Sequence, residues 1–117
     1  MALPINTIDE FREYLQGVVE RATHHATNIN EVILTLAGVV VLFKDPGRPL
    51  NVMTREGMQA NVMWVTISGT RYALSYNYSE ESVEIRRGSL QGQVEDSFDN
   101  DTTPQEILRI FRRLRGF

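Results

Sequence analysis

The chain has 117 residues, of which 42% are hydrophobic and 23% are charged, and it contains no cysteine. This size and composition predict one globular domain over residues 1–117. The lack of cysteine excludes disulfides, thiolate nucleophiles and zinc sites with sulfur ligands. The net charge of −3 argues against a protein dedicated to nucleic acids or anionic membrane surfaces, since both attract positive charge.

The sequence shows no targeting signal. Residues 1–10 lack the basic segment and the apolar stretch of a signal peptide. The longest apolar run, residues 32–43, is shorter than the ~20 residues that a membrane-spanning helix needs. We therefore expect a cytoplasmic protein.

Three segments carry the pattern of a capping box, in which a polar residue is followed three positions later by glutamate: Thr7–Glu10, Asn28–Glu31 and Thr103–Glu106. Pro104 suits the first position of the third helix, because a proline there removes no hydrogen bond. Helices are predicted from Thr7 to about Thr27 and from Thr103 onward. Their apolar stripes are Ile8, Phe11, Leu15, Val18, Ala22 and Ala26 in the first, and Ile107, Ile110, Phe111 and Leu114 in the last.

The apolar segment Val32–Phe43 fits two structures. Its three consecutive valines favour a buried strand. Its length, the capping pattern before it and the sequence Lys44–Gly47 after it favour a helix. We interpret it as a helix that is buried on every side, with a strand as the alternative.

The remaining segments predict an antiparallel sheet, because β-forming residues alternate there with turn residues. The predicted strands are Leu50–Thr54, Asn61–Ile67, Arg71–Tyr78 and Val83–Gly88, with Gln93–Phe98 as an optional edge strand. The fold class is therefore α+β, with two N-terminal helices, an antiparallel meander sheet of four or five strands and a C-terminal helix.

Side chains alternate between the two faces of a sheet, so the turn lengths decide which residues share a face. Even-length turns produce one coherent apolar face, which consists of Met63, Val65, Ile67, Tyr72, Leu74, Tyr76, Tyr78, Val83 and Ile85. The opposite face is then polar apart from Val62 and Trp64.

Trp64 is the only tryptophan, and we expect Arg71, Ser75, Asn77 and Arg86 near it on the polar face. An indole can stack on a planar group, and arginines hold carboxylates or other anions. These five residues are the candidate binding site. The alternative is a structural Trp64 that packs against the middle helix or an oligomer partner.

No catalytic or metal-binding pattern is present. His24 and His25 are adjacent on a predicted helix, so their side chains diverge by about a hundred degrees and cannot grip one ion. The acidic segment 95–101 lacks the glycine and the final glutamate of a calcium loop. There is no P-loop, dinucleotide fingerprint or nucleophile elbow. We therefore expect no catalytic residues, no metal and no cofactor.

Two other functions stay open. A small hydrolytic enzyme would draw on His24 or His25 and the carboxylates of residues 95–101. A nucleic-acid binder would use the arginines of the last helix, although cations are also favourable at any helix C-terminus. Those arginines are Arg109, Arg112, Arg113 and Arg115.

Short segments along most of the chain resemble small orphan proteins encoded in bacterial integron gene cassettes. The segments are His24–Ala26, Asn30–Val32, Leu36–Gly38, Asn61–Trp64, Arg71–Ala73, Ser75–Asn77 and Ser97–Phe98. The resemblance implies a mobile-element origin and no assigned activity, so it supplies no catalytic residue. We expect a non-catalytic binding or interaction module that forms a homo-oligomer, as a dimer, with a small molecule or another protein as a further partner. Neither a membrane nor a nucleic acid is expected as a partner.

Overall fold

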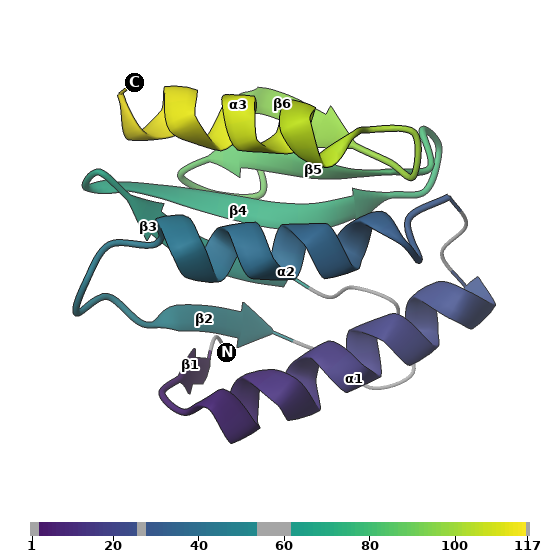
Figure 1. The fold of residues 1–117 in the computed structure, drawn as a ribbon, viewed down its shortest axis with the longest axis horizontal. Coiled ribbons are helices and arrows are strands. Elements are labelled where there is room, and N and C mark those ends of the chain that lie inside the picture. Colours follow the sequence, from purple (N-terminus) through teal and green to yellow (C-terminus); the bar gives the residue numbers. More distant parts are fainter. Residues whose placement is uncertain (1–2, 26–27, 54–61, 117) are drawn as a thin grey trace.

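The computed structural model describes residues 3–25, 28–53 and 62–116. In chain order its elements are β1 (Leu3–Ile5), α1 (Ile8–His25), α2 (Val32–Phe43), β2 (Leu50–Met53), β3 (Val62–Ile67), β4 (Thr70–Asn77), β5 (Ser82–Arg87), β6 (Val94–Phe98) and α3 (Pro104–Arg115). The strands form one antiparallel sheet in sequence order, and the helices lie on one side of it (Figure 1). The predicted α+β meander is confirmed, with six strands rather than four or five.

The additional strand is β1, which pairs with β2 so that Leu3 lies opposite Val52. Three residues are too short to show a period in the sequence, and Pro4 argues against a strand there. Proline is nevertheless tolerated at the edge of a sheet, because one side of an edge strand needs no N–H donor.

The capping boxes of α1 and α3 are confirmed. The Thr7 hydroxyl accepts a hydrogen bond from the backbone N–H of Glu10 at 3.1 Å, and the Glu10 carboxylate accepts one from the N–H of Thr7 at 3.0 Å. Thr103 and Glu106 make the same reciprocal pair at 3.1 and 3.2 Å. The predicted stripe of α3 faces the core, with Ile107 and Phe111 completely buried.

The predicted stripe of α1 is wrong at its first position. Ile8 is 83% exposed, because α1 begins beside the edge strand β1, where little of the sheet remains to cover it (Figure 1). Phe11, Leu15 and Val18 are half-buried, and Ala22 is buried. Ala26 and the predicted end at Thr27 lie outside the described residues.

The middle segment is the helix α2, as predicted, but two details differ. The capping box at Asn28–Glu31 does not form: Asn28 adopts a left-handed conformation with φ 66°, and the N-cap residue Glu31 makes no side-chain cap. Burial on every side is also wrong, since Leu34, Val41 and Leu42 are 57%, 49% and 64% exposed. One side of α2 faces solvent because only the opposite side rests on the sheet and α3.

The predicted division of the sheet into two faces is confirmed by the register. Ile67 lies opposite Thr70 across a two-residue turn, and Asn77 lies opposite Ser82 across a four-residue loop. Both turn residues have positive φ, 51° at Ser68 and 79° at Gly69, as a tight hairpin requires. Tyr78 is an exception, because the strand ends before it and its side chain is half exposed. The predicted strand ends at Thr54 and Asn61 lie outside the described residues.

The core lies between the sheet and the helices. Phe111 of α3 packs between Phe43 and Phe98, with ring centroids 5.9 and 6.0 Å apart. Its most deeply buried side chains are Phe98, Phe111, Ile67, Ile85, Ile107, Val40 and Val65. This one-sided core leaves the polar face of the sheet without a helix over it in the described part of the chain (Figure 1).

Candidate functional site

The five residues of the candidate binding site lie on the polar face of the sheet. Trp64 lies opposite Ala73, which in turn lies opposite Arg86. Ala73 belongs to β4, and alternate positions of this strand on either side of it carry Arg71, Ser75 and Asn77. Trp64 is half-buried. Its neighbours on β3, Met63 and Val65, belong to the core between the sheet and the helices, so Trp64 points to the other face and does not pack against α2.

Trp64 and Arg71 stack on each other. The Arg71 Cζ lies 5.1 Å from the centroid of the indole ring, within the range of a cation–π interaction. Arg71 is exposed, and among the described residues no carboxylate forms an ion pair with it. A cation therefore lies at an aromatic surface on the outside of the molecule.

Asn77 and Arg86 are joined by Glu84. One carboxylate oxygen of Glu84 accepts from Arg86 Nη2 at 2.9 Å, and the other accepts from Asn77 Nδ2 at 2.9 Å. Arg86 also donates to the carbonyl oxygen of Gly92 at 3.0 Å. The hydrogen bond from Asn77, followed by that from Arg86, lowers the pKa of Glu84. The charge of Arg86 is thus balanced by Glu84 within the protein, whereas no described carboxylate forms an ion pair with Arg71.

The sequence contained a signal for this bridge, because Glu84 and Arg86 are two apart on one strand and so share a face. Ser75 lies opposite Glu84 in the register and opposite Val62 on its other side. It therefore lies directly beside the bridging carboxylate residue Glu84, whereas Ala73 is the residue between Trp64 and Arg86.

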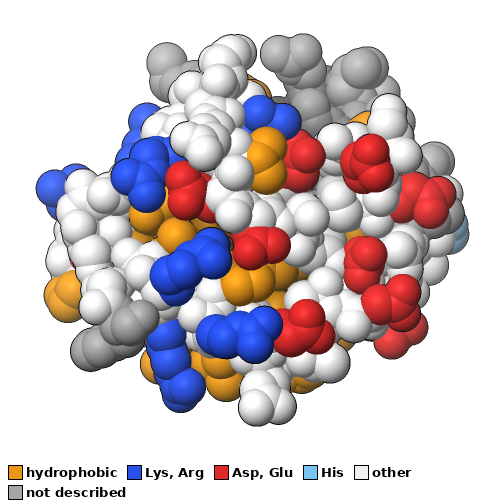
Figure 2. Space-filling view, turned by 90° about the horizontal axis from the view of Figure 1, so that it is seen from above, with side chains coloured by type: hydrophobic (Ala, Val, Ile, Leu, Met, Phe, Trp, Pro, Cys, Tyr) orange, Lys and Arg blue, Asp and Glu red, His pale blue; other side chains and the backbone are white. Residues whose placement is uncertain are grey.

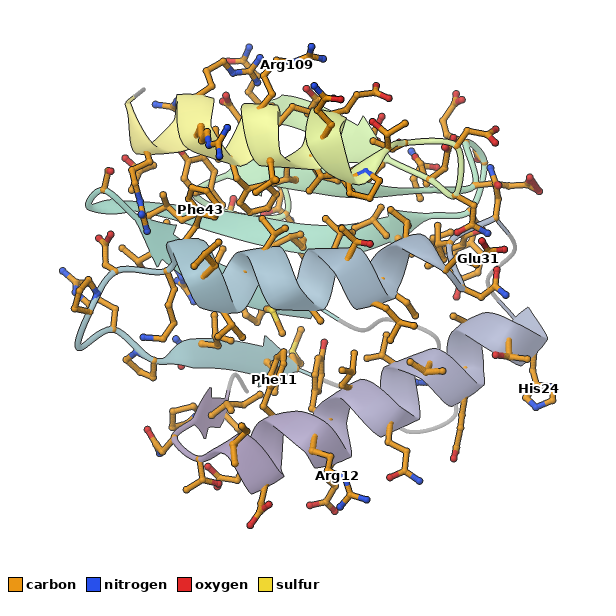
Figure 3. The ribbon with its side chains drawn as sticks, viewed as in Figure 1. Phe11, Arg12, His24, Glu31, Phe43 and Arg109 are labelled. Atoms are coloured by element: carbon orange, nitrogen blue, oxygen red, sulfur yellow. The ribbon has the colours of Figure 1, made fainter. Side chains whose placement is uncertain are left out.

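The residues of the enzyme alternative do not form one site. His24 is exposed and points away from the sheet at the end of α1 (Figure 3), and the side chain of His25 lies outside the described part. Segment 95–101 reaches the connection between α1 and α2, but through Asn100 rather than through a carboxylate. Among the described residues, no three His, Cys, Asp or Glu side chains are grouped to hold a metal ion.

The arginines of α3 divide into two groups. Arg109, Arg112 and Arg113 are exposed, and Arg113 approaches Asp96 at 3.7 Å. Arg115 instead folds back, donates to the carbonyl oxygen of Phe43 at 2.7 Å and covers the ring of that residue. Figure 2 shows acidic side chains beside the basic ones on this side of the molecule. This surface therefore carries mixed charge rather than a continuous basic patch.

The sequence did not predict the exposed apolar stripe on α2. Leu34, Val41 and Leu42 form this stripe, with Gly38, also exposed, between them. A helix without any charged residue is predicted to be buried on every side, so only the three-dimensional structure could show that one side of α2 is exposed to solvent. In the part of the chain that the structure describes, no helix has the length and apolar character needed to cross a membrane.

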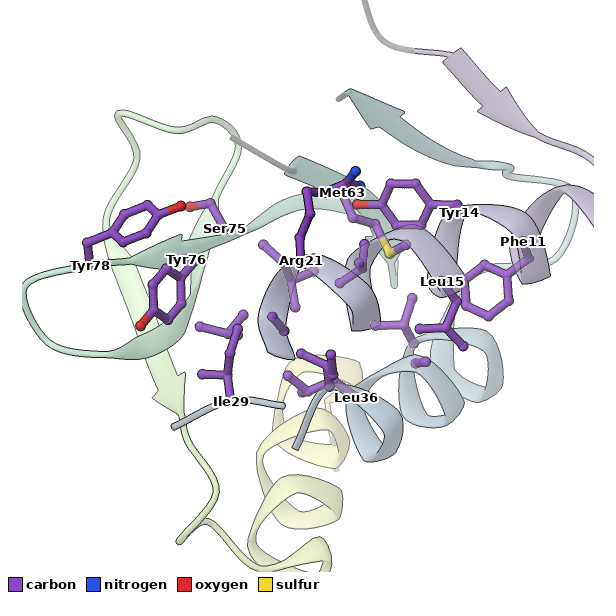
Figure 4. Close-up of a pocket in the computed structure, with 17 residues that line it drawn as sticks. Phe11, Tyr14, Leu15, Arg21, Ile29, Leu36, Met63, Ser75, Tyr76 and Tyr78 are labelled. Atoms are coloured by element: carbon purple, nitrogen blue, oxygen red, sulfur yellow. The ribbon is translucent and has the colours of Figure 1, made fainter. Parts of the chain in front are cut away.

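A cavity of about 110 Å³ is the other feature that the sequence did not predict. It lies between α1, α2 and the sheet (Figure 4). Phe11, Leu15 and Val18, which the sequence assigns to the core, line it from α1. Neither His24 nor the acidic segment 95–101 contributes to its lining.

Residues 11–109 match the family model described as integron cassette protein VCH_CASS1 chain. Because this range covers most of the sequence, the chain belongs to that family of integron cassette proteins, whose function is uncharacterised. Every segment that carries the resemblance in the sequence lies within the matched range. A search of curated proteins found no match.

Proposed function

We propose that this integron cassette protein is a non-catalytic interaction module that forms a homodimer through the polar face of its sheet. The observation that supports this most is the stacked pair of Trp64 and Arg71 on the face that no described helix covers. Tryptophan and arginine are the residue types that most often dominate the binding energy of protein interfaces.

Side chains on the polar face of the sheet are already held in place for such a contact. Glu84 fixes the side chains of Asn77 and Arg86 before any partner arrives, which reduces the entropy lost on binding. Arg71, which no described carboxylate balances, would meet a carboxylate of the second copy across the two-fold axis. Trp64 would supply the flat apolar contact at the centre.

Trp64 provides the test, because it is the only tryptophan and reports on its own surroundings. Light scattering after size exclusion should give the mass of a dimer, and dilution should shift the Trp64 emission as the dimer dissociates. Trp64→Ala and Arg71→Glu should both give monomers. Arg12→Glu makes the same charge change on the outer side of α1 (Figure 3) and should leave the dimer intact. A wild-type monomer, or a dimer unaffected by either sheet variant, would refute the proposal.

The exposed stripe of α2 favours a second candidate, self-association through that helix. Large aliphatic side chains exposed together are typical of interaction surfaces. Leu42→Arg would then give a monomer, while Trp64→Ala would not. The emission of Trp64 would also be unchanged by dilution, since α2 lies on the other side of the sheet. The two variants therefore decide between the two surfaces.

A further inference from the structure

The cavity between α1, α2 and the sheet is lined mainly by apolar side chains. Ile33, Leu36 and Val40 of α2 form one wall. Phe11 and Leu15 of α1 form the facing wall (Figure 4). Walls that face each other across such a space make fewer van der Waals contacts than closely packed walls do. A ligand with an apolar body would supply those contacts and remove both surfaces from water.

The size of the cavity suits a single ring. Its volume is about 110 Å³. An engineered apolar cavity of about 150 Å³ in another protein binds benzene. The space here is smaller but open at one end, where Tyr76 and Tyr78 line it with their rings edge to face at 4.6 Å (Figure 4). Tyr78 is 51% exposed, so this end reaches solvent and provides an entrance for a small molecule.

The Tyr14 hydroxyl lies at the other end of the cavity. Figure 4 shows it beside Met63 and Arg21. Burial, opposed by the charge of Arg21, raises the pKa of Tyr14 to about 12, so the hydroxyl keeps its proton at neutral pH. A protonated phenol can both donate and accept a hydrogen bond. It can therefore pair with a neutral polar group of a ligand, such as a hydroxyl.

The charge in the described part of the lining is already engaged. Arg21 is the only charged residue there, and its side chain interacts with other groups of the protein. A charged ligand would have to give up its hydration among apolar walls, which is far less favourable than the transfer of an uncharged molecule. The lining therefore favours an uncharged ligand.

From this arrangement we propose that the cavity binds a small uncharged molecule with one apolar ring and one hydroxyl group. The ring lies between α1 and α2, and the hydroxyl forms a hydrogen bond with Tyr14. The hydroxyls at the open end are weaker partners, because water competes there with the ligand for hydrogen bonds. The site is separate from the Trp64 surface, since Met63 and Leu74 line it from the core side of the sheet.

2-Phenylethanol is the probe, and phenylacetate is its charged counterpart of nearly the same size. Titrations followed by ¹H–¹⁵N NMR should show the alcohol binding about tenfold or more tightly than the acid, because the carboxylate loses its hydration. Amide shifts are expected at residues 15, 37 and 74, which line the cavity from α1, α2 and β4. Intermolecular NOEs should connect the ring protons of the alcohol to the methyl groups of Leu15 and Leu36.

Two tyrosine variants test the hydrogen bond. Tyr14→Phe should weaken binding of the alcohol about twofold to tenfold, as the loss of one neutral hydrogen bond does. Ethylbenzene, which has no hydroxyl, should bind equally to Tyr14→Phe and to the wild type. Tyr78→Phe is the matched control at the open end and should bind the alcohol as the wild type does.

Two variants of α2 test the location. Ala37→Leu fills the cavity and should abolish binding of the alcohol, while a dispersed NMR spectrum shows that the fold remains. Val41→Leu enlarges a side chain that is 49% exposed on the same helix and should leave the affinity unchanged.

The assignment is overturned if no amide shifts at up to about 10 mM alcohol, or if phenylacetate binds as tightly as the alcohol. It is also overturned if binding survives Ala37→Leu, or if Tyr14→Phe binds the alcohol no more weakly than Tyr78→Phe does. NOEs from the alcohol to side chains outside the lining would overturn it without any variant. None of these results bears on the homodimer, because Trp64 and Arg71 are unchanged in every variant.

Discussion

The side-chain oxygen of Asn100 lies 2.9 Å from the backbone nitrogen of Val32 and caps the N-terminus of α2, although the two residues are 68 positions apart in the sequence. The same oxygen accepts from the N–H of Glu31 at 3.0 Å, and the Asn100 backbone N–H donates to the carbonyl oxygen of Asn28 at 2.8 Å. At the other end of α2, Arg115 donates to the carbonyl oxygen of Phe43. Asn100, which precedes α3, and Arg115, the last residue of α3, thus stabilise the two ends of α2, a helix that has no charged residue of its own.

Asn100→Ala should destabilise the protein by about 1–2 kcal/mol, the usual effect of removing a side-chain cap. The loss leaves two N–H groups of α2 without their acceptor. Urea unfolding followed by circular dichroism measures the change. Asn30→Ala is the matched control, because it removes only the partner of the Asn100 side-chain amide at 2.9 Å. Equal losses in the two variants would contradict the capping role.

Arg115→Met should destabilise the protein by about 1 kcal/mol, since it removes the hydrogen bond to the last turn of α2 while keeping an apolar stem. The same unfolding experiment applies. Arg112→Met changes an exposed arginine on the same helix and should leave the free energy of unfolding within about 0.5 kcal/mol of the wild type. A larger effect of Arg112→Met would indicate that charge alone stabilises this region.

These contacts explain which parts of the fold could be predicted from the sequence. The capping boxes at Thr7 and Thr103 involve residues three apart, so the sequence contains all of their geometry. The box at Asn28 failed because Asn100, far away in the chain, supplies the acceptor that Glu31 and Val32 need.

The candidate site shows the same division. Alternation along the strands was enough to place Trp64 and Arg71 on one face. The cavity depends instead on how α1 rests on the sheet and on α2, so that Phe11 and Leu15 line a space rather than fill the core. A periodic pattern identifies the side of a helix that faces the core. It carries no information about the distance between that side and the elements against which the helix packs.

Acid should weaken the fold through Asp45. Its two carboxylate oxygens accept hydrogen bonds from the backbone N–H groups of Ser68 and Gly69, at 2.7 and 2.8 Å, in the β3–β4 turn. The bond from Gly69, followed by that from Ser68, lowers the pKa of Asp45 in the folded state. A carboxyl group with a lowered folded pKa stabilises above its unfolded pKa, which is about 3.9. That stability is lost as the pH falls through the folded value.

Urea unfolding at pH values from 7 to about 2.5 measures this dependence, because aspartates titrate within that range. Asp45→Asn should reduce stability at pH 7 and flatten the dependence at acid pH. Glu84 and Glu106, whose pKa values are also lowered, should keep the remaining slope of the same sign. Glu13→Gln, at an exposed carboxylate of α1, is the control and should leave the slope close to that of the wild type.

Gly17→Ala should raise the free energy of unfolding by about 0.5–1 kcal/mol, because alanine favours a helix more than glycine does. The new methyl group approaches Arg21 Nη2 at 3.2 Å, and a flexible side chain can move away from it. That movement should cost little, so most of the gain in helix stability should remain.

Gly38→Ala makes the same substitution in α2, where no described atom outside its own turn of helix lies within 4 Å of the new methyl group. It should raise the free energy of unfolding by about the same amount as Gly17→Ala. Thermal unfolding of both variants measures the two gains. A clearly smaller gain for Gly17→Ala would show that Arg21 moves away only at a cost in stability. A loss of stability in Gly17→Ala would contradict the prediction, because the guanidinium would then need the space over the glycine.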